Sequence, residues 1–199
     1  MSGEKAVQRR APLTRKPPIV VPASEVRGEG IFLILNEKKI AAWLPTGRDR
    51  EIALEQAHKL WCKSRRLETA ESPFPGLRYV MAHTFSHALM RQLALECGYA
   101  AASLKERIYA READDDGPAM AGLLIYTAAP DSEGTLGGLV SLGKPERLGR
   151  HIRNALEAMR LCASDPLCAE HLPLAEEPTL HGAACHACMF SPETSCERQ

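Results

Sequence analysis

The sequence predicts a mixed α/β (α+β) domain, in which a small sheet is packed by two central helices and closed by a cysteine-rich knuckle near the C-terminal end. Three observations support this fold class. Two apolar runs, 31–35 and 121–128, have the length of buried strands. Two longer segments, 77–97 and 145–161, repeat apolar residues at helical spacing. Five of the seven cysteines lie in the last third of the chain, where a shared ligand explains their clustering better than packing does.

The length and charge of the chain limit the classes of protein to consider. At 199 residues, it is long enough to form one domain with a sizeable core. Its 25 Lys and Arg residues balance 25 Asp and Glu residues, so no overall field attracts nucleic acid and any DNA contact needs a local patch. No apolar run approaches the length of a membrane span, and no apolar signal segment follows the first residues. We therefore expect a cytoplasmic protein, in a compartment where disulfides are rare.

The composition of residues 1–27 predicts a disordered basic arm, which precedes a folded domain at 28–199. Prolines and cations are frequent in the arm, and little of it could pack in a core. Such an arm can touch phosphates, although it more often only keeps a protein in solution. The cations and prolines are Lys5, Arg9, Arg10, Arg15 and Lys16, with Pro12, Pro17, Pro18 and Pro22.

The first part of the folded domain should contain a strand and two helices. The strand at 31–35 is followed by Asn36, a residue type that caps helix N-termini, and a short helix should end before Pro45. A second helix should begin at Thr46. The cations of the segment 63–66 would end this helix favourably for its dipole.

The segment 77–97 is the strongest helix prediction, because apolar residues cover much of its circumference. A helix of this kind is central to a fold, and Gly98 should end it. Ser103 and Glu106 then form the Ser-x-x-Glu pattern of a capping box, which predicts a further short helix through Tyr109.

His83 and His87 are four residues apart and therefore lie on one face of the central helix. Their spacing is that of the HExxH zinc hydrolases. Position 84 is Thr, so the adjacent glutamate that would activate water is absent. We therefore expect hydrogen-bonded core histidines rather than a second metal site.

The strand at 121–128 leads into the acidic, glycine-rich loop Asp131–Gly138. We expect a tight turn there, because Asp131 and Glu133 would repel phosphate and no Gly-Lys-Ser/Thr follows. If the loop were a site, these carboxylates would suit a metal, a general base or a basic partner surface.

Pro145 opens the second long helix. Its apolar stripe should face the core, and its basic residues form the densest positive surface outside the arm. A solvated face is favoured over a phosphate-contacting face. The stripe consists of Leu148, Ile152, Leu156 and Met159, and the basic side chains are Arg147, Arg150, His151, Arg153 and Arg160.

Cys185 and Cys188 form a CxxC knuckle, whose two intervening residues let both sulfurs reach one tetrahedral zinc ion at about 2.3 Å. Cys168 and Cys196 lie at spacings that suit a second pair of ligands. Cys162 could replace Cys168, and spacing does not decide between them. Structural zinc explains the pattern better than disulfides or thioredoxin-type chemistry, because the compartment is reducing and a proline-containing loop follows the knuckle. Further alternative ligands are His181 and His186.

Several of these motifs occur in the order found in the MrfA-type zinc-binding domain, a helicase-associated domain long classified as one of unknown function. Within this family, residues 28–199 resemble the C-terminal region of the DrmB proteins of the DISARM antiphage system. The matching motifs are His83-Thr-Phe-Ser-His87, Ile125-Tyr126 with the loop Asp131–Gly138, the pair Cys162 and Cys168, the Ala-Cys-His-Ala-Cys knuckle that ends at Cys188, and Pro192-Glu-Thr-Ser-Cys196.

The resemblance implies a structural zinc ion held by Cys168, Cys185, Cys188 and Cys196. It also implies an accessory module, not itself an enzyme, of a helicase-containing DNA-processing complex in phage defence. The implied partner is a DrmA-like superfamily 2 helicase subunit, with DNA as a further contact. The sequence has no GxxxxGK[ST] motif, so the helicase motor would have to belong to that partner.

A rival function is that of a metal-dependent hydrolase or nuclease that uses His83, His87, Asp131 and Glu133. This function requires the four side chains to converge on one cleft, with a histidine within hydrogen-bond reach of a carboxylate.

Overall fold

The computed structural model of the chain describes most of the domain and the segments around its cysteines. Three predictions fall mainly or wholly outside the described residues: the basic arm, the carboxylates Asp131 and Glu133, and the alternative ligands His181 and His186. The described residues are 19–20, 25, 28–67, 72–114, 117–127, 138–162, 164–171, 185 and 187–198.

The sheet has three antiparallel strands in the order β1-β3-β2: β1 (Gly30–Ile34), β2 (Leu104–Arg111) and β3 (Met120–Thr127). The two apolar runs of the sequence form β1 and β3, as predicted. In the register, Ile125 of the central strand lies between Ile31 of β1 and Glu106 of β2. The alternation of side chains in strands therefore places Glu106 in the same layer as these two apolar residues.

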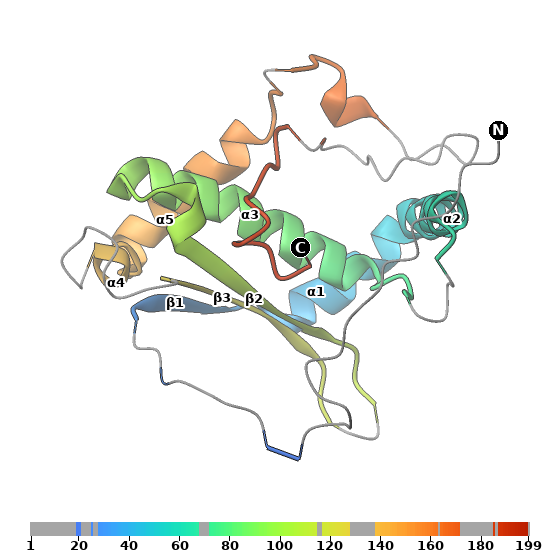
Figure 1. Cartoon of the computed structure of the whole chain (residues 1–199), viewed down its shortest axis with the longest axis horizontal. Coiled ribbons are helices and arrows are strands. Elements are labelled where there is room, and N and C mark those ends of the chain that lie inside the picture. The colour runs from blue at the N-terminus through green and yellow to red at the C-terminus, as the bar shows by residue number, and fades with distance from the viewer. Residues whose placement is uncertain are drawn as a thin grey trace.

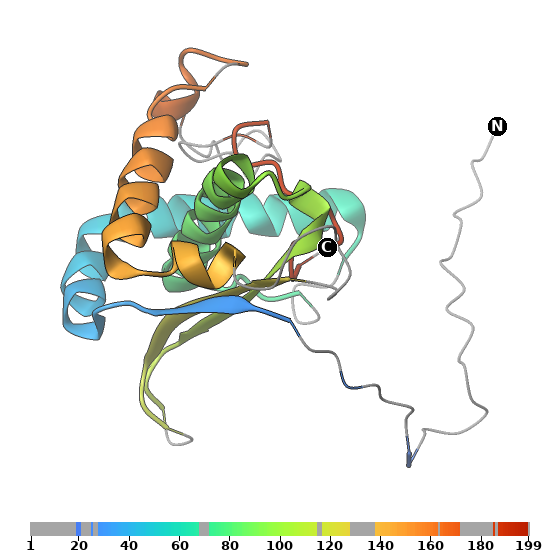
Figure 2. The same ribbon diagram turned by 90° about the vertical axis from the view of Figure 1, so that its left-hand side faces the viewer.

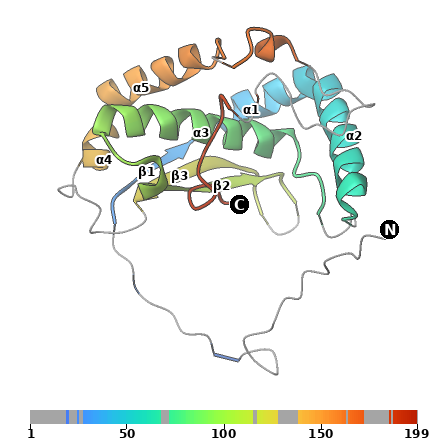
Figure 3. The ribbon, with the colours of Figure 1, turned by 45° about the horizontal axis from the view of Figure 1, so that its top comes forward.

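Helices cover one face of this sheet (Figures 1 and 2). The central helix α3 lies across β2 and β3, and α5 packs against α3 (Figure 3). Leu89 and Leu93 of α3 are fully buried, as are Leu123 and Ile125 of β3. These side chains form the core between helix and sheet. The helices are α1 (Glu37–Trp43), α2 (Arg48–Arg65), α3 (Leu77–Cys97), α4 (Gly138–Leu142) and α5 (Pro145–Ala158).

Several local signals of the sequence act as predicted. The Asn36 side chain accepts a hydrogen bond from the backbone N–H of Lys39 at 3.1 Å and so caps α1. The helix α3 has the predicted bounds, and Gly98 follows it with a φ of +70°, a left-handed conformation that favours glycine. Pro145 opens α5, as expected for the first helical position.

The predicted helix between Ser103 and Tyr109 is wrong, because these residues enter the strand β2. The Ser103 hydroxyl donates to the carbonyl of Ala100 at 2.6 Å instead of capping a helix. Leu104, Glu106 and Ile108 alternate along β2 and are all buried. Pairing with β3 over eight residues outweighs the local capping signal, because it buries this whole face of the strand.

The opposite face of the sheet carries aromatic and basic side chains. Phe32 is 53% exposed and lies at the strand register of Leu124 and Arg107. Its ring meets that of Tyr109 edge to face, with centroids 5.5 Å apart. Lys105 lies opposite Tyr126 on the same face. We call these residues the open sheet face. In the part of the chain that the structure describes, the helices lie on the other side of the sheet (Figure 2).

Among the described residues, none of the helices combines the length and the apolar character that a membrane crossing needs.

Candidate metal centre

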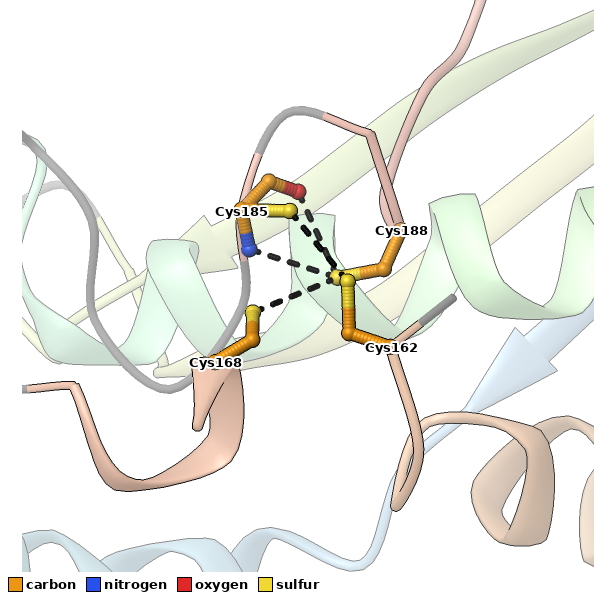
Figure 4. A group of neighbouring side chains, drawn as sticks. All are labelled: Cys162, Cys168, Cys185 and Cys188. Atoms are coloured by element: carbon orange, nitrogen blue, oxygen red, sulfur yellow. Dashed lines mark hydrogen bonds between the residues drawn. The ribbon is translucent and has the colours of Figure 1, made fainter. Parts of the chain in front are cut away.

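Four cysteine side chains from two separate stretches of chain point toward one another (Figure 4). Cys162 follows the end of α5, and Cys168 begins a short 3-10 turn. Cys185 and Cys188 come from the CxxC knuckle. Their four sulfur atoms all lie within 4.8 Å of one another. We call this group the four-cysteine cluster.

The spacing of these sulfur atoms suits one tetrahedral ion. Ligands placed about 2.3 Å from a tetrahedral zinc ion are about 3.8 Å from each other. The sulfur of Cys162 lies 3.6 Å from that of Cys185, and the sulfur of Cys168 lies 3.9 Å from that of Cys188. These two distances bracket the tetrahedral value, so the cluster can accept zinc with little movement.

Backbone hydrogen bonds shape the knuckle around its sulfurs. The backbone N–H of Cys185 donates to the sulfur of Cys188 at 3.2 Å, and the N–H of Met189 donates to the carbonyl of Cys185 at 3.1 Å. A backbone N–H of Cys188 lowers the pKa of the Cys185 thiol to about 7, whereas burial raises the pKa of the Cys168 thiol. Four thiolates this close repel one another, and a divalent cation offsets that repulsion.

The grouping of cysteines differs from the expected set at one position. Cys168, Cys185 and Cys188 lie together, as expected of common ligands, and Cys162 is the fourth member of the group. Cys196 lies instead beside the histidines of α3. The cysteine spacing allows Cys162 as an alternative to Cys168, but both belong to the same cluster.

The second cluster joins His83 and His87 of α3 to Glu106 of β2 and to Cys196. The Nε2 atom of His83 lies 2.9 Å from Oε1 of Glu106 and 3.2 Å from the sulfur of Cys196. The Nε2 atom of His87 lies 3.2 Å from the same Oε1 atom. We call this group the histidine cluster.

Hydrogen bonding sets the electrostatics of the histidine cluster. Burial opposes the charged forms, but contacts with Cys196 and Glu106 outweigh it and raise the pKa of His83 to about 9 and that of His87 to about 10. Burial likewise raises the pKa of Glu106 and Cys196, yet the histidines outweigh it. They hold the Glu106 pKa well below its usual range and lower the Cys196 pKa to about 6. Two anionic groups and two cationic rings thus balance each other.

The C-terminal segment, residues 187–198, carries Cys196 to this cluster by binding along the outer edge of β2. The backbone N–H of Glu106 donates to the carbonyl of Ser195 at 3.1 Å, and the N–H of Ile108 donates to a carboxylate oxygen of Glu197 at 2.9 Å. The Tyr79 hydroxyl donates to the other oxygen of Glu197 at 2.7 Å. These contacts satisfy an edge that would otherwise leave its polar groups unpaired.

The arrangement changes the interpretation of the α3 histidines. They are hydrogen-bonded and partly buried, as expected, and a histidine does lie within hydrogen-bond reach of a carboxylate. That carboxylate is Glu106, for which the sequence predicts a place in a helix capping box with Ser103. Leu104 and Ile108 are four residues apart with three charged residues between them, a spacing that a helix also produces, so no local pattern places Glu106 on the inner face of a strand. Asp131 and Glu133, the other groups of the rival enzyme, lie outside the described residues.

Comparisons with known proteins agree with the zinc interpretation of the cysteines. Residues 85–189 match the family model of the MrfA Zn-binding domain. The chain is also 41% identical over 180 residues to the DISARM protein DrmB of Bacillus paralicheniformis, an alignment that covers 89% of this chain and 30% of that protein. The chain therefore spans less than a third of the length of this relative.

We predict that Glu197→Ala weakens the attachment of the C-terminal segment. The substitution leaves the N–H of Ile108 and the hydroxyl of Tyr79 without their acceptor, and an unpaired buried donor costs about 1–3 kcal/mol. The free energy of unfolding, measured by urea titration, should fall by an amount in this range. Glu193→Ala is the matched control, since Glu193 is exposed in the same segment and should change stability by less than about 0.5 kcal/mol. Equal effects of the two substitutions would contradict this role of Glu197.

Proposed function

The chain belongs to the MrfA Zn-binding domain family, and from that premise we propose that it is a zinc-stabilised accessory module of a helicase-containing DNA-processing complex in phage defence. The observation that carries the proposal is the four-cysteine cluster, all of whose members lie within the stretch that matches the family. The likeness to a DISARM protein supports phage defence as the setting.

In this proposal Cys162, Cys168, Cys185 and Cys188 hold a structural zinc ion. Four protein ligands close the coordination shell, so the ion serves the fold and leaves no position for a reacting water. The ion would join the end of α5 to the knuckle, where Cys185 lies 23 positions after Cys162. Zinc binding to such sites contributes about 10–16 kcal/mol of apparent free energy, comparable with the net stability of a whole domain.

A groove beside the four-cysteine cluster, lined by both apolar and polar side chains, is the surface that we propose docks the helicase subunit. It lies between α3 and α5, has a volume of about 150 Å³, and is lined by Leu95, Met159 and Leu161 together with Cys162 and Cys188. Leu95 is 79% exposed and Leu161 is 83% exposed. Neighbouring exposed leucines around a groove are typical of protein-interaction surfaces. Zinc bound by Cys162 and Cys188 would thus fix the side of the groove that these two residues line.

The open sheet face is the surface that we propose contacts DNA. A helicase produces single strands, whose bases stack on aromatic side chains while nearby cations bind the backbone. Phe32, Tyr109 and Tyr126 supply aromatic rings, and Lys105 and Arg107 supply positive charge on the same face. Because the chain has no net charge, a contact with DNA needs a local basic patch, and this face provides one.

We predict that Cys162→Ser removes about one zinc ion per chain, because a four-cysteine cluster that loses a thiolate no longer closes the coordination shell. Zinc measured by plasma mass spectrometry after gel filtration tests this. Cys62→Ala is the matched control, since Cys62 is a buried cysteine of α2 outside both clusters and should leave the zinc content unchanged. A Cys162→Ser protein with full zinc content would contradict the ligand set.

We predict that Leu95→Glu disrupts binding to the helicase subunit while zinc content stays normal. A charge in the groove would have to be desolvated against an apolar partner surface. Co-purification with a tagged DrmA-like subunit measures the loss, which should exceed tenfold. Val140→Glu is the matched control, because Val140 is 54% exposed on α4 and does not line the groove. Undiminished co-purification of the Leu95 variant would rule out this docking surface.

We predict that Phe32→Ala weakens binding of a fluorescent single-stranded oligonucleotide. Loss of one stacking ring costs about 1–3 kcal/mol, which corresponds to an increase in Kd of roughly 5-fold to 150-fold. Phe190→Ala serves as the control, since Phe190 is 52% exposed, nearly as much as Phe32, but belongs to the C-terminal segment. Anisotropy titrations that give equal Kd values for the two variants would exclude the open sheet face as the DNA surface.

A further inference from the structure

We propose that the histidine cluster is a second zinc site, in which His83, His87, Glu106 and Cys196 bind the ion. This site lies where α3, β2 and the C-terminal segment meet, and shares no residue with the four-cysteine cluster. It is separate from the four-cysteine cluster on which the zinc interpretation of the family match rests, because the matched stretch, residues 85–189, begins after His83 and ends before Cys196.

The donor atoms have the identities and the arrangement that zinc requires. Two imidazole nitrogens, one thiolate and one carboxylate oxygen all lie within 4.8 Å of one another. In a zinc tetrahedron with such ligands, neighbouring donors are about 3.3–3.7 Å apart. Three of the donor pairs lie 2.9–3.2 Å apart and the others lie within 4.8 Å, so side-chain movements of about 1 Å or less would bring the four donors to these separations.

The hydrogen bond at the far side of His87 orients this ring for metal binding. Its Nδ1 atom lies 2.8 Å from the carbonyl oxygen of Met189. A carbonyl oxygen can only accept, so Nδ1 carries a hydrogen and a neutral ring has its lone pair on Nε2. That lone pair points into the cluster, toward Glu106. Metal-binding histidines characteristically donate their second ring N–H to a carbonyl or carboxylate in this way.

The positive charge that the buried anions of the cluster require can come from two ring protons or from one metal ion. The Glu106 side chain is fully shielded from solvent, and a buried carboxylate without a cation is strongly destabilising. The Nε2 atom of His83 faces two acceptors at once, Glu106 and Cys196, whereas its single N–H can point well at only one of them. A divalent ion among the four donors contacts both the Glu106 oxygen and the Cys196 sulfur, and it replaces two protons with equal charge.

The mixed donor set favours zinc over the other common divalent ions. A thiolate and two imidazoles disfavour calcium and magnesium, which prefer oxygen ligands. Zinc accepts nitrogen, sulfur and oxygen donors in one tetrahedral shell. With four protein ligands the shell is closed, so the ion would fasten the C-terminal segment to α3 and β2 rather than activate a water molecule.

The test is the zinc content of the purified 199-residue chain and of variants that each remove one site. We expect about two zinc ions per wild-type chain and about one in Cys196→Ser, since this variant keeps the four-cysteine cluster intact. The matched variant Cys162→Ser should also keep about one ion, but in the histidine cluster. Cobalt substitution shows which site each variant retains. The thiolate-to-cobalt absorption should be strong in Cys196→Ser, whose remaining site has four thiolates. It should be weak in Cys162→Ser, whose remaining site has one thiolate.

X-ray absorption at the zinc edge of the wild-type chain decides the matter even if a variant fails to fold. A second site predicts a zinc shell of sulfur mixed with nitrogen and oxygen, whereas the four-cysteine cluster alone predicts sulfur only. An all-sulfur shell would overturn the proposal, and so would a folded Cys196→Ser protein with the wild-type zinc content. Either result would mean that protons, rather than a metal ion, supply the positive charge beside Glu106.

Discussion

The buried carboxylate of Glu106 constrains much of this structure. It lies on the inner face of β2, beside Ile125 of the central strand, where an uncompensated charge would oppose folding. Compensation comes from His83 and His87 of α3 and from a backbone N–H of the C-terminal segment, at Glu197. Helix, sheet edge and C-terminal segment must therefore be in place together, because each supplies part of the environment that this one side chain requires.

The two clusters are connected through a single backbone group. Met189 follows directly after Cys188 of the knuckle, and its carbonyl oxygen accepts the hydrogen bond from His87. The orientation of a ring in the histidine cluster thus depends on the path of the chain that leaves the four-cysteine cluster. Further along the same segment, Ser195 and Glu197 pair with the edge of β2. A change at the knuckle can reach the sheet through this short, hydrogen-bonded stretch.

Sequence patterns predicted those parts of the fold that depend on neighbours along the chain. The bounds of α3 and the cap at Asn36 follow from helical periodicity and local hydrogen bonding. The strand β2 was missed because a capping pattern at Ser103 competed with a pairing to β3 that no local signal reveals. The grouping of cysteines depends on how the C-terminal segment packs against α3 and β2. The spacing of cysteines in the sequence therefore cannot predict that Cys196 lies apart from the other four.

The strand order has a consequence for how the protein is made. Glu29, at the entry to β1, bonds with Thr127, which lies 98 positions later in the chain. A ribosome adds about 5–20 residues per second, so the first strand waits on the order of 5–20 seconds for its partner. During that time its unpaired edge and the side chain of Ile31, later buried, are open to other chains. The strand order thus sets how long this segment must stay unpaired while the rest of the chain is synthesised.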